Sequence, residues 1–210
     1  MKLRLLPLLF VSLLPSCTRG GEVEDGGVFT TRSACPLLGI PAATGDVTLF
    51  NPPESRDASA IDVTATITNL SASCNDTGAQ VVSNATFDVL AVRRDATAAR
   101  QVVLPFFTVV VQGGSQVIAK RVGRVGLNFA AGSYRAETRG QSVVRVSRSV
   151  ATLPASVREV LNRKRKAGDE SAAIDPLTDP TVRAAVARAT FEQLVGFQMT
   201  PEMLKYNATR

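Results

Sequence analysis

The chain contains no histidine and no tryptophan, and only 5% of its 210 residues are aromatic. Histidine is the commonest general base and metal ligand near neutral pH, and hydroxyl or thiol nucleophiles usually need a neighbouring base. The carboxylates fall mostly in predicted turns and helix caps, and no phosphate, dinucleotide or calcium loop motif is present. So few aromatic rings also disfavour a carbohydrate-stacking surface. We therefore expect no catalytic site, no metal and no cofactor.

Long apolar runs are also missing. Residues 5–14 form a ten-residue apolar run, whereas a helix that crosses a bilayer needs roughly 20 apolar residues. The run follows the basic residues Lys2 and Arg4. A basic start, a short apolar run and a small-residue ending form the pattern of an export signal. We therefore predict a signal peptide over residues 1–16.

The run ends in Leu14-Pro15-Ser16-Cys17. This ending resembles the lipobox of bacterial lipoproteins, in which an apolar residue three places before a cysteine and a small residue just before it precede lipidation. Leu14 and Ser16 match this pattern, and Pro15 is a less usual occupant of its position. The resemblance implies that Cys17 is the acylated mature N-terminus, and several acyl chains give a stable anchor. The alternative is an ordinary signal peptide in which Cys17 is incidental.

The segment after Cys17 is rich in glycine and has little apolar surface to bury, as expected of a flexible tether over residues 17–33. Thr18, where some lipoproteins have aspartate, fits sorting to the outer membrane in that family. We therefore expect a lipid-anchored protein of the bacterial cell envelope, in the outer membrane and facing the periplasm.

The chain has three cysteines. If Cys17 carries lipid, Cys35 and Cys74 remain as one pair in an oxidising compartment, which favours a disulfide. Two free buried thiols or a metal-binding pair are the alternatives. A zinc site lacks further ligands, because the chain has no histidine.

Positive charge is concentrated in residues 86–166, which contain fifteen basic and four acidic residues, a net charge of +11. The rest of the mature chain carries −7. A field of this kind favours an anionic envelope polymer, an acidic envelope protein or a nucleic acid as partner. The export signal disfavours nucleic acid.

Between Cys35 and Val150 the sequence has the pattern of β-strands. In residues 61–68 apolar side chains alternate with aspartate and threonine, which gives one apolar and one polar face. Similar segments separated by turn residues, with no intervening helix, predict an antiparallel β-sandwich over residues 34–152. The predicted strands cover residues 46–50, 61–67, 80–94, 100–111, 116–129, 134–139 and 144–147, and residues 69–78 are predicted to form a turn.

Two glycine- and proline-containing segments give finer predictions. Pro105 lies in an otherwise apolar strand, so we expect a bulge or an edge position there. Placing Tyr134 and Ala136 on the same face as Val144 requires an odd-numbered loop around Gly140. We predict a loop of three or five residues at that point.

Gly132-Ser133-Tyr134-Arg135-Ala136 resembles the tyrosine corner of immunoglobulin-like sandwiches, with Ala136 in the place of the usual cysteine. The resemblance implies an immunoglobulin-like sandwich, although the tryptophan typical of that family is absent. The alternative interpretation of Tyr134 is a half-buried strand residue.

Residues 153–210 are predicted to form a small helical appendage. Pro154 starts one predicted helix, which runs through the basic residues 163–166 to Gly168. Asp179-Pro180 has the pattern of a helix cap followed by proline at the first helical position, and the apolar stripe that follows predicts a helix ending at Gly196 and packed on the sandwich. A third short helix is predicted to begin near Pro201.

The most concentrated basic run is Arg163, Lys164, Arg165 and Lys166. It fits a solvated helix end, an electrostatic contact with anionic lipid or polysaccharide, or a contact with an acidic protein. We regard these four residues as a candidate basic contact surface. Two functions remain: a non-catalytic envelope lipoprotein that serves as an interaction or structural module of a membrane assembly, or a ligand-binding or chaperone-like lipoprotein that holds an apolar or acidic client.

Overall fold

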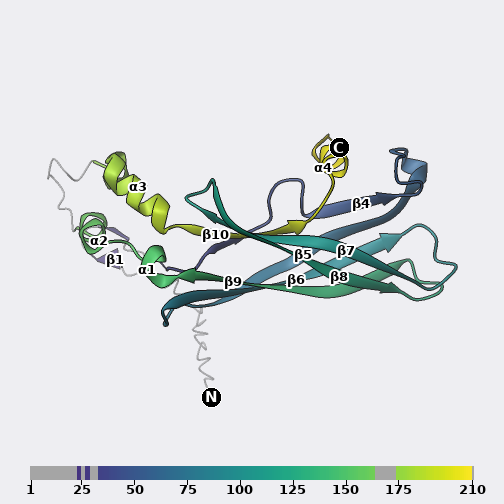
Figure 1. Ribbon diagram of the computed structural model, residues 1–210, viewed down its shortest axis with the longest axis horizontal. Coiled ribbons are helices and arrows are strands. Elements are labelled where there is room, and N and C mark those ends of the chain that lie inside the picture. The colour runs from purple at the N-terminus through teal and green to yellow at the C-terminus, as the bar shows by residue number, and fades with distance from the viewer. Residues whose placement is uncertain (1–22, 25–26, 29–32, 164–173, 210) are drawn as a thin grey trace, which may run out of the picture.

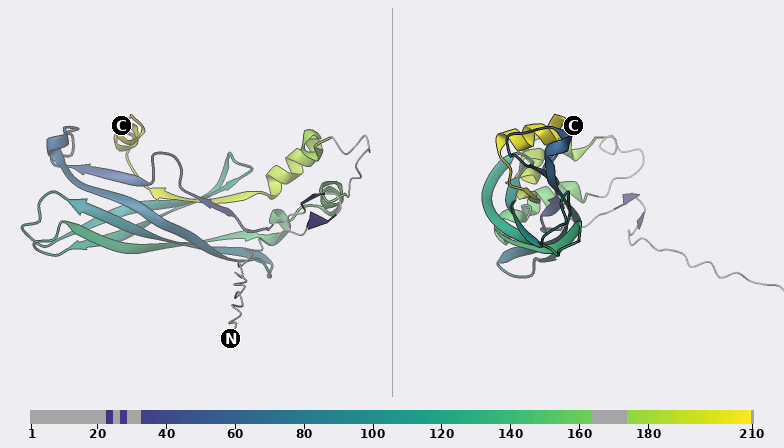
Figure 2. Two further views of the ribbon diagram at one scale, coloured as in Figure 1. Left: turned by 180° about the vertical axis from the view of Figure 1, so that it is seen from behind. Right: turned by 90° about the vertical axis from the view of Figure 1, so that its right-hand side faces the viewer.

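The computed structural model describes residues 23–24, 27–28, 33–163 and 174–209. In this part of the chain two four-stranded sheets face each other in an elongated β-sandwich (Figure 1). Viewed along its length, the sandwich is narrow, and the sheets curve around a common core (Figure 2). The predicted mainly β fold with C-terminal helices is confirmed.

Several predictions concern residues outside these ranges. The signal peptide 1–16, the acylation of Cys17 and most of the tether 17–33 lie outside the described residues. The same holds for Lys164, Arg165 and Lys166.

The first sheet is antiparallel and has the strand order β4-β5-β6-β9. Its strands are β4 (Asp46–Phe50), β5 (Ile61–Asn75), β6 (Gln80–Arg93) and β9 (Arg135–Ser147). The second sheet has the order β3-β10-β7-β8, and its β3–β10 pair is parallel. Its strands are β3 (Leu37–Gly39), β10 (Phe191–Phe197), β7 (Arg100–Gln112) and β8 (Gln116–Phe129). Strands of 13 to 15 residues extend over roughly 45 Å, which explains the elongated shape.

Short helices complete the fold: η1 (Ala58–Ala60), α1 (Arg148–Ala151), α2 (Ala155–Leu161), η3 (Pro176–Thr178), α3 (Pro180–Ala189) and α4 (Pro201–Thr209). The two-residue strands β1 (Val23–Glu24) and β2 (Gly27–Val28) pair with each other. Helices α1, α2 and α3 gather at one end of the sandwich, and α4 lies on β4 (Figure 1). Asn207 fixes α4 there, because its side chain donates to the Asp46 carbonyl at 2.7 Å.

The main core lies between the sheets and is formed by alternate residues of the long strands. Phe87 on β6 meets Phe106 on β7 in an edge-to-face contact, with ring centroids 5.1 Å apart, a geometry that aromatic pairs prefer. The other buried members include Val63, Ala65, Val89, Leu104, Leu127, Phe129, Val195 and Phe197. The predicted alternation along residues 61–67 and 80–94 is thus confirmed.

The predicted turn at residues 69–78 is wrong in its first part, since β5 continues to Asn75. A register shift between Thr68 and Ser71 interrupts the pairing with β6, and Asn69 there has a positive φ of 51°. The bulge places two residues of β5, Asn69 and Leu70, opposite the single residue Phe87 of β6. They bend the strand instead of ending it.

The loop predicted around Gly140 is also wrong, because β9 passes through this residue without a break. Gly140 pairs with Phe87 on β6, and a Cβ atom at this position would clash with the Phe87 ring. The glycine is needed for close packing rather than for a turn. Ala136 and Val144 are eight positions apart, so an uninterrupted strand places them on one face as well.

The predicted appendage 153–210 contains a strand of the sandwich. Residues 191–197 form β10 instead of the end of a helix, and β10 lies between β3 and β7. Helix α3 ends at Ala189, and its buried residues Val182 and Ala185 pack with Leu153 and Val157 rather than in the core between the sheets. The boundary predicted at residue 152 therefore does not separate the sheets from the helices.

The remaining local predictions have mixed outcomes. Helix α2 ends at Leu161, before Arg163, so it is shorter than predicted. The register shift of β7 lies between Val110 and Val111, not at Pro105. Pro105 lies just beyond the last residue pair of β7 with β10, and its carbonyl accepts from the Gln198 backbone N–H. Pro105 therefore lies in an inner strand with partners on both sides, so neither the predicted bulge nor the predicted edge position is confirmed.

Tyr134 is 58% exposed and lies just before β9. A tyrosine corner requires a ring packed at the corner of the sandwich, so the exposed Tyr134 does not support this resemblance. The half-buried alternative is wrong as well. The parallel β3–β10 pair is a further departure from the expected antiparallel pattern.

Candidate interaction surface

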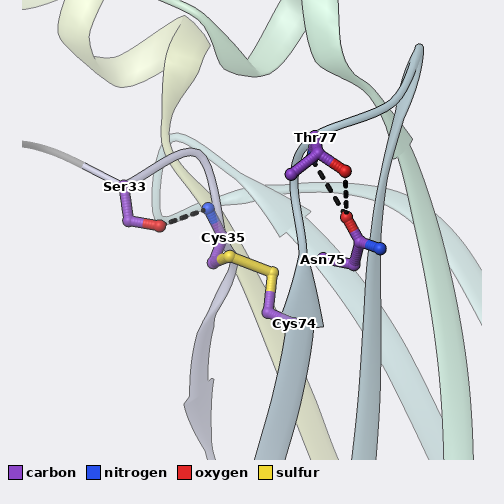
Figure 3. Close-up of a disulfide and its surroundings, with 5 residues drawn as sticks. All are labelled: Ser33, Cys35, Cys74, Asn75 and Thr77. Atoms are coloured by element: carbon purple, nitrogen blue, oxygen red, sulfur yellow. Dashed lines mark hydrogen bonds between the residues drawn. A yellow bond between two sulfur atoms is a disulfide. The ribbon is translucent and has the colours of Figure 1, made fainter.

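The predicted disulfide is present. Cys35 and Cys74 are bonded, with their Cα atoms 6.1 Å apart (Figure 3). The bond joins the segment before β3 to the end of β5, and thus ties the start of the second sheet to the first. The Ser33 hydroxyl accepts from the Cys35 N–H at 3.1 Å, while Asn75 closes the turn after β5 through Thr77 (Figure 3). The disulfide therefore stabilises the end of the sandwich at which β5 ends and the segment before β3 enters.

The basic residues of region 86–166 divide into two groups. Four of them, Arg93, Arg100, Arg139 and Arg148, make side-chain hydrogen bonds or ion pairs within the fold. A second group is exposed on the surface. Arg163 belongs to this second group and directly follows Asn162, the C-cap residue of α2.

Arg93 is the most deeply buried cation, with 3% of its surface exposed. Its Nε donates to the Ser133 carbonyl at 2.8 Å, and its two terminal nitrogens donate to the carbonyls of Ala98, Ala96 and Ala130. The guanidinium also lies 5.0 Å from the centre of the Phe129 ring, a favourable cation–π distance. Arg93 therefore holds the β6–β7 and β8–β9 loops together, and its role is structural.

Two exposed cations, Arg100 and Arg139, form ion pairs. Arg100 contacts Asp62 at 2.8 Å, and Arg139 contacts Asp88 at 2.9 Å. A hydrogen bond from Asn69 is the larger cause that holds the pKa of Asp88 below its ordinary value, followed by the hydrogen bond from Arg139. The lowered pKa keeps Asp88 in the charged, paired form, which makes this carboxylate unsuited to general acid catalysis.

Three exposed cations lie close together on β8: Lys120, Arg121 and Arg124. None of them has an ion pair with a described acidic residue. Lys120 lies 5.2 Å from the centre of the Phe107 ring on the outer face of the second sheet. These three residues are interspersed with exposed apolar side chains. We call residues 117–124 of β8 the basic edge.

The basic edge is open because β8 and β9 separate along their length. The tip of the β7–β8 hairpin contacts the end of α3, where Gly113 donates to the Thr190 carbonyl. The end of β9 instead contacts the β5–β6 turn, where the Arg148 N–H donates to the Ala79 carbonyl. On the inward face of β8, Val125 and Leu127 are consequently buried in the second half, whereas Arg121 in the first half is exposed.

The sequence analysis did not identify the basic edge, although its residues lie inside the predicted basic region. The signal was present: residues 116–124 place basic residues among valines without the strict alternation of a half-buried strand. Among the described residues the basic edge is where exposed cations and exposed apolar side chains coincide on one strand.

Other kinds of site find little support in the described residues. No group of three or more potential metal ligands is present among them. A hollow beside the β5–β6 turn, lined by Ala79, Ser147, Ser149 and Leu153, is largely open to solvent. No helix in the described part of the chain has the length and apolar character needed to cross a membrane.

Neither models of known protein families, nor curated proteins, nor solved structures match this chain.

Proposed function

We propose that this chain is a non-catalytic lipoprotein of the bacterial cell envelope, anchored through Cys17, that uses its basic region as a contact surface in a membrane assembly. The observation that carries this proposal is the division of the basic residues. Arg93, Arg100 and Arg139 serve the fold, whereas the cations of the basic edge are exposed and have no acidic partner among the described residues. Unneutralised charge gathered on one edge favours an anionic partner.

A role without catalysis agrees with the chemistry available. The chain has no histidine, and Asp62 and Asp88 are held in ion pairs with arginine. The hydroxyl groups beside the open hollow, Ser147 and Ser149, bond to each other at 2.9 Å, not to a base. A nucleophile normally needs a base within hydrogen-bonding reach. We therefore infer binding as the function.

The alternative is a ligand-binding or chaperone-like lipoprotein. An enclosed apolar cavity between helices and sheets would favour it. The space between the sheets is instead filled by close-packed side chains such as Phe87, Phe106 and Phe129, and the hollow near α1 is open. These observations favour contact through the surface over enclosure of a ligand.

The anchor has a direct test. We expect the intact mass of the membrane-extracted protein to equal that of a chain beginning at Cys17 plus its acyl groups. The Cys17→Ser variant should be released from the membrane fraction. A mature, unlipidated chain that begins at another residue would refute the anchoring part of the proposal.

The contact surface is tested by placing a photo-crosslinking residue at Lys120 or Arg124 in the membrane-anchored protein. Thr66, exposed on the outer face of the first sheet, is the matched control position. We expect crosslinks to envelope components from positions 120 and 124 but not from 66, and we expect fewer at high salt because screening weakens charge contacts. Equal crosslinking from all three positions would contradict a specific surface.

The predicted run at residues 163–166 is tested in the same preparation. Replacing Arg163, Lys164, Arg165 and Lys166 by glutamine should leave the fold intact, because exposed substitutions usually change stability by less than about 0.5 kcal/mol. A loss of crosslinked partners from position 120 in this variant would show that the run and the basic edge serve one surface. Unchanged crosslinking would restrict the contact to β8.

A further inference from the structure

The basic edge has an unpaired backbone. β8 is the last strand of its sheet and pairs only with β7 in the described chain. No backbone hydrogen bond outside that pairing involves residues 117–124. Every second residue of the edge therefore directs its N–H and C=O away from the sheet, where a further strand would find them.

The other sheet edges differ from this one. The edge strands β3 and β4 have only 3 and 5 residues, and short edges protect a sheet from unwanted pairing. β9 is as long as β7, but its inward residues Val144 and Val146 are buried against the second sheet. β8 has 14 residues and no proline, and its first half is exposed on both faces. A strand added there would find apolar neighbours on either side.

We propose that residues 117–124 of β8 bind an extended acidic segment of a partner protein as an additional strand of the second sheet. This inference rests on the proposed function, because it specifies how the contact surface recognises its partner. Backbone hydrogen bonds supply the binding in this mode of recognition, and alternate side chains supply the selectivity.

The side chains of the edge define what the added strand must carry. Lys120, Val122 and Arg124 alternate along the outer face of the sheet, and Arg121 lies on the opposite face. Opposite charges on neighbouring strands attract, and aliphatic residues pack with aliphatic residues. A strand that combines glutamate or aspartate with valine or isoleucine is therefore the complementary partner.

A second copy of this chain is a poor occupant. Pairing β8 with β8 would place six cations on the two adjoining edges, three from each copy, and like charges on paired strands repel. An anionic lipid surface would neutralise the cations but would leave the backbone groups of the edge without partners, which is unfavourable next to an apolar phase. An acidic strand satisfies the charges and the backbone together.

The probe for this proposal is a fluorescent eight-residue peptide in which glutamate and valine alternate. Its binding to the full mature protein is measured by fluorescence anisotropy at low salt. A second peptide has the same sequence but carries N-methyl groups at alternate residues, which remove hydrogen-bond donors from one edge and keep the charge. We expect the N-methylated peptide to bind at least tenfold more weakly, and amides of residues 117–124 to become protected from hydrogen exchange with the first peptide.

Variants test the part played by charge. Lys120→Gln with Arg124→Gln should weaken binding of the first peptide at least tenfold. The matched control is Arg135→Gln with Arg145→Gln on β9, two exposed cations away from the basic edge, and it should bind as the parent does. Circular dichroism checks that both double variants fold. If the β8 variant fails to fold, the exchange protection of the parent protein still decides the question.

Several results would overturn the proposal. Equal binding of both peptides would reduce the contact to charge alone. Competition by phosphatidylglycerol vesicles as strong as that by unlabelled peptide, without exchange protection of the edge, would assign the surface to lipid. Self-association with protection of residues 117–124 would assign it to a second copy. Crosslinks from Lys120 without peptide binding would leave the proposed function in place and refute strand addition. Peptide binding by a protein that is not lipid-anchored would support strand addition and refute the anchoring part of the proposed function.

Discussion

Arg93 offers the sharpest test of how the sandwich is held together. We predict that Arg93→Met destabilises the protein by about 3 kcal/mol. The side chain makes four hydrogen bonds to carbonyls at 2.7 to 3.2 Å, and each net contribution is about 1 kcal/mol, or somewhat more with a charged donor.

Two features reduce the expected loss of stability in Arg93→Met. The carbonyls of Ala96 and Ala130 keep a second partner, since they also accept from the N–H groups of Gly132 and Ser133. Methionine preserves much of the apolar stem, which packs beside Phe129, and removes the desolvation cost of a buried cation. Substitution by lysine tests the opposite case, in which the charge is kept and the guanidinium geometry is lost. Lysine keeps the charge, but its single ammonium group cannot reach all four carbonyls. We therefore expect Arg93→Lys to lower the free energy of unfolding by at least 3 kcal/mol.

The assay is equilibrium unfolding in urea. The chain has no tryptophan, so far-ultraviolet circular dichroism is the suitable signal. Arg94→Met is the matched control, because Arg94 is the exposed neighbour of Arg93 and its replacement should change stability by less than about 0.5 kcal/mol. If Arg93→Met were as mild as Arg94→Met, water would replace the guanidinium at these carbonyls, and the clamp of the two loops would not exist.

Three further predictions follow from single contacts. Replacing Cys35 and Cys74 by alanine should lower the free energy of unfolding by about 4 kcal/mol in the chain-entropy model; an unchanged urea midpoint after reduction of the parent protein would contradict this. Gly140→Ala should cost about 1–3 kcal/mol through overpacking against Phe87, whereas the strand glycine control Gly126→Ala, whose new Cβ would lie 3.6 Å from Gln101, should be milder in the same assay. Because the pKa of Asp88 is lowered in the fold, its stabilising contribution is present above the pKa of the unfolded state and is lost as pH falls through the lower folded value. An NMR titration should show a higher Asp88 pKa in Asn69→Gly and a smaller rise in Arg139→Gln, and an unmoved pKa in both would refute the assigned causes.

Particular residues explain which parts of the fold could be predicted from the sequence and which could not. The strands at residues 46–50, 80–94 and 116–129 were predictable because apolar patterning and turn residues agree there. The Cys35–Cys74 bond followed from compartment and counting. Gly140 was misjudged, because glycine marks both turns and close approach, and only the position of Phe87 distinguishes them. Residues 191–197 were misjudged because a short apolar run fits either a helix or a strand, and pairing with β7 decides.

The candidate site was less predictable than the fold. Net charge identified the region 86–166, but its function depends on which cations have partners. Arg100 and Asp62 are far apart in sequence, as are Arg139 and Asp88, so their pairing appears only in the folded chain. Arg93 looks like any surface arginine until the loops at Ala98 and Ala130 surround it. What remains exposed on β8 is therefore a result of tertiary structure.

The central place of β10 has a consequence for the biogenesis of this protein. Synthesis from the N-terminus delivers β7 and β8 before residues 191–197 of β10. Until β10 is present, β7 has an unpaired edge along Phe106 to Gln112, and β3 has no strand to pair with. Pairing between segments so distant in sequence is slow, and open edges invite aggregation in the meantime. The second sheet is thus completed only after residue 197 has been made, and a protease that cuts before Phe191 removes an inner strand of the sheet.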